Sequence, residues 1–132
     1  MSIPQQGGGP IESFDQLDVY MEAGCKPKAD WRVGTEHEKF GFTPDHKPAT
    51  YDDIRGLMER LTAFGWSRVE EQGKLIGLSR GGANISLEPG GQFELSGAPV
   101  VNIHDTAAEL ANHLDEVGQV GGDLRFMSIG AA

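Results

Sequence analysis

The chain has 132 residues and a formal net charge of −9 at pH 7, from 20 acidic and 11 basic side chains. Such an acidic chain lacks the basic surface that binds nucleic acid or an anionic membrane, so we expect neither partner. Its single cysteine, Cys25, excludes an intrachain disulfide, and without a secretion signal or a long apolar run we expect a cytoplasmic protein.

The first 12 residues predict a flexible tail, because the run Gly7–Pro10 favours neither a helix nor a strand. A short helix is predicted to begin at Ser13. Its apolar residues fall on one stripe, and Gly24 and the proline after it end the pattern. The stripe consists of Phe14, Leu17 and Met21.

Residues 31 to about 43 predict a long strand. Side chains an even number of positions apart on a strand share a face, so Glu36, Glu38, Phe40 and Phe42 point one way. The other face carries Trp31, Val33, Thr35, His37 and Lys39. Neither face is cleanly apolar, so burial alone does not explain this pattern.

A second helix is predicted from Thr50, which forms a capping box with Asp53, to Gly65. Its buried stripe is Ile54, Leu57, Met58 and Leu61. Four short strands follow, over 66–71, 74–79, 83–88 and 92–96. The spacers between them are too short for a parallel crossover, so we expect antiparallel neighbours.

A third helix is predicted after the N-cap Asn102, with glycines weakening its end. We expect it to bury Ala107, Leu110, Ala111, Leu114 and Val117. A last strand is predicted over 124–129. The fold class that follows is α+β: an antiparallel sheet packs its apolar face on two or three helices and leaves a polar, acidic face open.

Two acidic motifs carry the functional signal. One contains Glu36 and Glu38, and the other places Glu88 and Glu94 on either side of the turn Pro89-Gly90-Gly91. Four glutamates on one face of a sheet would repel one another, at roughly 3 kcal/mol per pair about 5 Å apart at an effective dielectric near 20. A divalent cation offsets that repulsion, and Mg²⁺ prefers carboxylate oxygens. The alternative interpretation is a row of solvent-exposed charges.

The other polar candidates have simpler interpretations. Gly81-Gly82 is expected to be a hairpin turn rather than a phosphate loop, since a strand follows it. His37 lies on the face opposite the glutamates, so we expect it under a helix and not on a metal. His104 and His113 are interpreted as ordinary helix residues, and Cys25 as structural.

Two segments closely resemble the plant-type glutamate–cysteine ligase family, which plants share with many proteobacteria. They are Gly34-Thr35-Glu36-His37-Glu38-Lys39-Phe40-Gly41-Phe42 and the run from Ile85 to Pro99, with the sequence ISLEPGGQFELSGAP. The resemblance implies ATP-dependent ligation of the γ-carboxylate of glutamate to the amine of cysteine through γ-glutamyl phosphate, the first step of glutathione synthesis. It also implies a cup-shaped antiparallel sheet similar to that of glutamine synthetase.

By this resemblance, the catalytic residues and ligands of Mg²⁺ (with Mn²⁺ as an alternative) are Glu36, Glu38, Glu88 and Glu94. Weaker resemblance-based roles in binding glutamate, cysteine or ATP fall to Gln92, Phe42 and Arg80.

Members of this family are several-fold longer, so residues 13–132 are expected to be the N-terminal part of a larger catalytic domain and inactive alone. The competing hypothesis is a non-catalytic module that binds a metal, an amino acid or a partner. In that case an incomplete sheet would expose an edge through which the chain self-associates.

Overall fold

The computed structural model describes residues 9–128. The helices are α1 (Phe14–Ala23), α2 (Tyr51–Leu61) and α3 (Ile103–Val120). The strands are β1 (Glu36–Phe42), β2 (Ser67–Glu71), β3 (Lys74–Arg80), β4 (Ala83–Glu88), β5 (Gln92–Ser96) and β6 (Arg125–Ser128). Residues 1–8 of the predicted tail and Ile129 of the predicted last strand lie outside the described residues.

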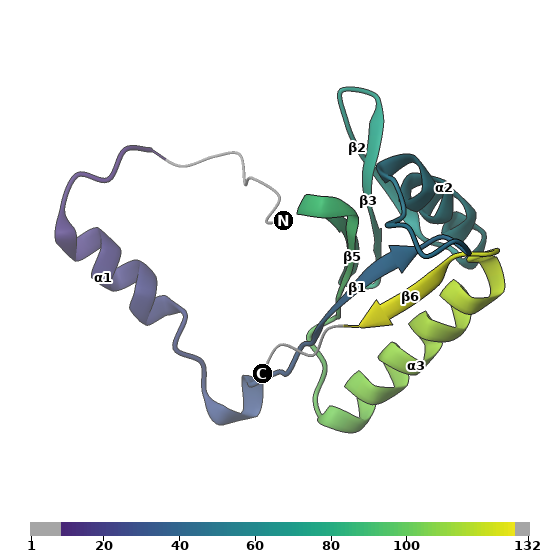
Figure 1. The fold of residues 1–132 in the computed structure, drawn as a ribbon. Helices are drawn as coiled ribbons and strands as arrows, with labels where there is room; N and C mark the ends of the chain where they lie inside the picture. The colour runs from purple at the N-terminus through teal and green to yellow at the C-terminus, as the bar shows by residue number, and fades with distance from the viewer. Residues whose placement is uncertain (1–8, 129–132) are drawn as a thin grey trace.

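The strands form one open antiparallel sheet in the order β2-β3-β4-β5-β1-β6. Helices α2 and α3 lie side by side next to this sheet (Figure 1). The predicted α+β class is therefore confirmed, whereas the glutamine-synthetase-like cup stays a prediction. The Gly81-Gly82 hairpin is also confirmed: both glycines have positive φ, 57° and 92°, as a two-residue turn between β3 and β4 requires.

Helix α2 forms as the sequence predicts. The Thr50 side chain accepts a hydrogen bond from the Asp53 backbone N–H, and the Asp53 carboxylate accepts one from the Thr50 N–H at 2.8 Å. Its four predicted apolar residues are fully buried, and they make up much of the core with strand residues of the helix-covered face. Among those strand residues are Leu78, Ile85, Phe93 and Leu95.

Helix α3 forms where predicted, but its predicted core face is only partly confirmed: Val117 is buried and Leu110 packs against the core. Only His113 and Val117 of the helix are buried, whereas Leu114 is 45% exposed and Ala107 and Ala111 are also exposed. The physical reason is that polar side chains anchor the helix to the sheet. The Glu109 carboxylate accepts from the Ala98 N–H at 2.9 Å, and Glu116 accepts from two side chains on the sheet side.

Strand β1 is shorter than the predicted segment and begins at Glu36. Before it, the chain makes one isolated bridge, between Val33 and Val100. Upstream of that bridge, local hydrogen bonds replace strand pairing, because the Trp31 indole donates to the Lys26 carbonyl at 2.9 Å and the Arg32 guanidinium donates to the Ala29 carbonyl at 3.2 Å.

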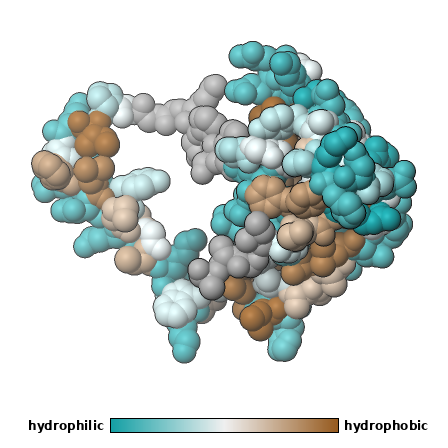
Figure 2. All heavy atoms as spheres, viewed as in Figure 1, coloured by the Kyte–Doolittle hydropathy of each residue, from teal (hydrophilic) through white to brown (hydrophobic). Residues whose placement is uncertain are grey.

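Helix α1 also forms as predicted, yet it stands apart from the sheet and the other helices (Figure 1). None of its residues is buried, and Phe14 is 85% exposed. Hydrophobic residues are therefore visible on its surface (Figure 2). None of the described helices is long and apolar enough to span a membrane.

Candidate functional site

The four predicted glutamates lie on the same face of the sheet. In the register of β1 and β5, Glu38 is directly opposite Glu94, and Glu36 is opposite Ser96. In the register of β4 and β5, Glu94 is opposite Ser86 and Glu88 is opposite Gln92. Directly opposite residues of antiparallel strands project to the same side, so the two motifs come together on the face that helices α2 and α3 leave uncovered.

This acidic face is the back of a buried face, which explains why the register is fixed. Phe93 and Leu95 alternate with the polar residues of β5 and are fully buried. A slip of one residue would expose both of them and bury the glutamates instead. The core therefore keeps the four carboxylates on one face, in a diagonal acidic row that runs from Glu36 through the Glu38–Glu94 pair to Glu88.

The chain turns sharply between Glu88 and Gln92, where β4 ends and β5 begins. Gly90 and Gly91 have φ values of 77° and 76°, a left-handed conformation that glycine adopts without a steric penalty. The Gly90 N–H donates to the Tyr51 hydroxyl at 3.0 Å, so α2 holds the turn in place. The predicted rigid turn between the two glutamates is thus present in the structure.

The four carboxylates differ in their exposure and contacts. Glu94 is 7% exposed and accepts a hydrogen bond from the Ser96 hydroxyl at 2.7 Å. Glu88 is half-buried and accepts from the Ser86 hydroxyl at 3.0 Å. Glu36 is exposed and borders a surface hollow of about 360 Å³, which is lined by Gly34, Thr35, Glu36, Ser96 and Gly97.

The chemistry of these donors suits a hard divalent cation, because all four are carboxylates and their register partners are serine, glutamine or glutamate. Within residues 9–128, however, no three His, Cys, Asp or Glu side chains are already arranged to hold one ion. A cation on this face would therefore need some of the side chains to turn, or ligands from a bound substrate.

Gln92 and Phe42, two of the three weaker candidates, lie on the same face as the glutamates. Gln92 is half-buried between Glu88 on one side and Phe40 on the other. Phe42 lies at the C-terminal end of β1, two residues beyond Phe40 and opposite Arg125 of β6, and is also half-buried. Both positions lie beyond the Glu38–Glu94 pair on the acidic face.

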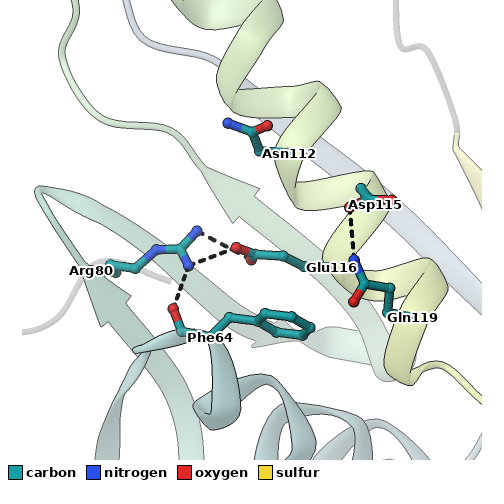
Figure 3. Close-up of a pocket in the computed structure, with 6 residues that line it drawn as sticks. All are labelled: Phe64, Arg80, Asn112, Asp115, Glu116 and Gln119. Atoms are coloured by element: carbon teal, nitrogen blue, oxygen red, sulfur yellow. Dashed lines mark hydrogen bonds and ion pairs between the residues drawn. The ribbon is translucent and has the colours of Figure 1, made fainter.

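Arg80 lies elsewhere. It is opposite the buried Ala83, so it projects from the helix-covered face, away from the glutamates. Its guanidinium donates to both carboxylate oxygens of Glu116, at 2.7 and 3.1 Å, and to the Phe64 carbonyl at 2.8 Å (Figure 3). It also stacks over the Trp66 ring at 4.2 Å. The anionic group that Arg80 meets is thus Glu116 of its own chain, and we remove Arg80 from the candidate site.

A second polar cluster lies behind the glutamates and was missed in the sequence. Among the described residues, the buried polar side chains are Lys39, Glu94 and His113. His113 stacks on Phe93 with ring centroids 5.7 Å apart, and neither of its ring nitrogens has a hydrogen-bond partner. Burial, with the nearby charge of Lys39, lowers the pKa of His113 to about 3. The interpretation of His113 as an ordinary helix residue was therefore wrong.

His37, at the edge of this cluster, lies where the alternation predicts, on the face opposite the glutamates. It is half-buried, and its Nε2 lies 3.1 Å from the Ser128 hydroxyl. Burial, followed by the Lys39 charge, lowers its pKa. The only signal of this cluster in the sequence is that the inward face of β1 carries Lys39, a polar residue at a position that should be apolar.

Comparison with known proteins identifies the relatives of this chain. The family described as Glutamate-cysteine ligase family 2 (GCS2) matches residues 32–132. "Glutamate--cysteine ligase A, chloroplastic" of Oryza sativa subsp. japonica is 49% identical over 120 residues, which cover 88% of this chain and 24% of the relative. The chloroplastic enzymes of Brassica juncea and Arabidopsis thaliana are both 47% identical, over 118 and 120 residues, and each match covers 88% of this chain and 23% of the relative. The chain thus spans about a quarter of the length of these relatives.

These names contradict the cytoplasmic location that we predict from the sequence. The plant relatives are named chloroplastic. The reason for the error is physical: acidity, a single cysteine and the lack of an apolar segment suit any aqueous, reducing compartment equally, so they do not single out the cytoplasm.

Proposed function

The chain belongs to glutamate–cysteine ligase family 2, and on this premise we propose that it supplies part of a site that joins glutamate to cysteine in glutathione synthesis. The observation that carries the proposal is the acidic face of the sheet. Two motifs about fifty residues apart meet there, with Glu38 directly opposite Glu94. A fold that needed only stability would not place these like charges side by side.

The proposed reaction has two steps. In the first, an oxygen of the glutamate γ-carboxylate attacks the γ-phosphorus of ATP, and ADP leaves with the electron pair of the broken P–O bond. In the second, the cysteine amine attacks the acyl carbon of γ-glutamyl phosphate, phosphate leaves, and the amine loses a proton as the amide forms. The first step brings two anionic groups together and the second releases an anionic phosphate, so positive charge and correct positioning lower both barriers.

In this proposal Glu36, Glu38, Glu88 and Glu94 hold Mg²⁺, or Mn²⁺ in its place. When bound, the cation neutralises the charge that develops on the phosphoryl group. The protein's part is to keep the carboxylates ionised and aligned. The core behind β5 fixes their spacing, and the Pro89–Gly91 turn fixes the entry of the chain into β5. In the same proposal, Gln92 binds a phosphate or a substrate group and Phe42 borders the amino-acid pocket.

Calorimetry with Mn²⁺ tests the cation site directly. Glu38→Gln removes one charge from the centre of the row and preserves side-chain size, so we expect roughly tenfold weaker binding or more. Glu71→Gln, at the exposed end of β2, is the matched control and should bind as the unmodified chain does. Equal affinity in both variants would exclude the row as the cation site.

The alternative is a module that binds a partner and does not ligate. The observation that favours it is the open sheet: in the described range, the outer edges of β2 and β6 pair with no further strand. Light scattering and an ATPase assay with and without glutamate separate the two proposals. Glutamate-dependent release of phosphate supports the ligase, whereas an inactive stable dimer supports the module.

A further inference from the structure

Lys39 is the most unusual residue behind the candidate site. Its side chain is 0% exposed, although it lies at the centre of β1 between two residues of the open face. Its Nζ donates to the His37 carbonyl at 3.0 Å and lies 3.0 Å from the His37 Nδ1. The ammonium also lies 5.0 Å from the centroid of the Phe93 ring. These contacts satisfy its hydrogens with neutral groups.

A buried charge with only neutral contacts is costly unless an opposite charge lies nearby. The carboxylate that acts on Lys39 is that of Glu94, which counteracts the effect of burial on the lysine; the balance lowers the pKa of Lys39 to about 8. A leucine or methionine at this position would pack in the core without this cost, so stability alone does not account for a lysine.

The register places this charge immediately behind the acidic row. Lys39 is opposite Phe93, and the neighbouring pair in the ladder is Glu38 and Glu94, whose side chains project from the other face. The ammonium and the two carboxylates thus lie on opposite faces of the sheet, at neighbouring positions of the ladder. In a partly buried setting such charges are screened far less by salt than surface charges are.

We propose that Lys39 is a positioning residue for the acidic row: its buried charge offsets the repulsion between Glu38 and Glu94 and sets how tightly that row binds a divalent cation. Only the effect on cation affinity rests on the proposed function, because the offset of the repulsion concerns the carboxylates alone. Coupling between charges is reciprocal, so a lysine that stabilises the ionised glutamates must also oppose the cation that competes for them. The Lys39 charge thus keeps the carboxylates aligned when no cation is bound, and it keeps cation binding reversible.

The test compares Lys39→Met with Lys74→Met, which removes the same net charge from an exposed end of β3. Manganese affinity at low and at moderate salt is measured by calorimetry. We expect Lys39→Met to bind Mn²⁺ about three- to tenfold more tightly, with little change in that ratio on adding salt, and Lys74→Met to bind as the unmodified chain does. A merely structural role would weaken binding, so unchanged or weaker affinity in a folded Lys39→Met protein overturns the proposal. Lys39→Arg keeps the charge and should leave the affinity within about twofold of the original.

A double-mutant cycle tests the interaction of Lys39 with the carboxylates in the absence of any cation. Urea midpoints are measured for the unmodified chain, Lys39→Met, Glu94→Gln and the double variant. We expect Glu94→Gln to be more destabilising, or less stabilising, with Lys39 present than in the Lys39→Met background. Additive midpoints would overturn the inference. If the cycle shows coupling while no variant binds Mn²⁺, the proposed cation site fails and the pairing of Lys39 with the row stands.

Discussion

Helices α2 and α3 are held on the sheet in different ways. The shorter helix, α2, buries four apolar side chains completely, Leu57 among them. The longer helix, α3, buries only His113 and Val117 and leaves Ile103 70% exposed. The difference shows that apolar periodicity orients a helix only when it outweighs the polar contacts that the same helix makes.

The carboxylates of α3 accept hydrogen bonds from groups on the sheet side. Glu109 holds the segment after β5 through the Ala98 N–H, and Glu116 holds β3 through Arg80. At the other end of the helix, Arg60 of α2 donates to the Val120 carbonyl at 2.7 Å. These hydrogen bonds hold α3 in an orientation that leaves Ala107, Ala111 and Leu114 exposed.

The largest test of this comparison is truncation of one leucine on each helix. Leu57→Ala leaves a cavity at a fully buried site, so we expect a loss of about 2–5 kcal/mol in the free energy of unfolding. Leu114→Ala removes a side chain that is 45% exposed and should cost less than about 1 kcal/mol. Urea denaturation measures both. Equal losses would mean that α3 packs on the face first predicted.

The second test concerns His113, the buried polar residue of α3. Both ring nitrogens lack partners, so His113→Leu should stabilise the fold by about 1–2 kcal/mol at pH 7. The pKa of His113 is about 3 when folded and near 6.5 when unfolded, so the unfolded state binds the extra proton between these values. Stability is therefore lost as pH falls from about 6.5 towards 3, and we expect the advantage of the leucine variant to grow by about 2–3 kcal/mol at pH 4.5.

Urea midpoints at pH 7 and pH 4.5 measure this effect, with His104→Leu as the control. His104 is exposed in the first turn of α3, so its replacement removes a histidine of the same helix without disturbing the core. If both variants show the same acid dependence as the unmodified chain, burial of His113 does not penalise its protonation.

The same comparison explains how much of the fold the sequence predicts. The face of α2 follows from four apolar residues at helical spacing, and the strand alternation of β1 and β5 follows from period two. The face of α3 does not follow, because it depends on partners such as Arg80 and the Ala98 N–H that lie far away in the chain. The periodicity of apolar residues predicts which face of a single element is buried, but it does not predict hydrogen bonds to residues far away in the chain.

The candidate site likewise has features that the sequence predicts and features that it does not. Strand parity puts Glu36 on the same face as Glu38, and the short turn does the same for Glu88 and Glu94. The pairing of β1 with β5, which joins the two motifs, follows from neither. The placement of Arg80 is not predictable, since its partner is Glu116, on a helix far away in the chain. Lys39 is visible as an anomaly in the sequence, but its complete burial follows only from the packing of Phe93 and His113 around it.

The third test removes the anchor that fixes the face of α3. Glu116→Gln keeps the size of the side chain but loses the charge that pairs with Arg80, and it disturbs the 2.9 Å hydrogen bond from the Trp66 indole. Glu116 is 14% exposed in its side chain and Arg80 is 34% exposed, so the pair is only partly screened. We expect a loss of about 1–2 kcal/mol. Asp115→Asn, on the exposed face of the same helix, is the matched control and should stay within about 0.5 kcal/mol of the unmodified chain.

The smallest test compares the N-caps of the two helices. Thr50→Ala removes the capping box of α2, whose first turn leads directly into the fully buried Ile54, so fraying there would expose the core. We expect a global loss of about 1 kcal/mol. Asn102 accepts from the His104 and Asp105 N–H groups at 2.9 and 3.1 Å, and its amide donates to the Asp105 carboxylate at 2.9 Å, so Asn102→Ala removes three hydrogen bonds.

The first turn of α3 is nevertheless exposed, and it can fray without opening the core. We therefore expect Asn102→Ala to cost less in global stability than Thr50→Ala, despite the larger number of bonds lost. Amide hydrogen exchange separates the two outcomes: in Asn102→Ala only the first turn of α3 should exchange faster, whereas in Thr50→Ala protection should fall across the core. A larger global loss for Asn102→Ala would show that α3 depends on its first turn as much as α2 does.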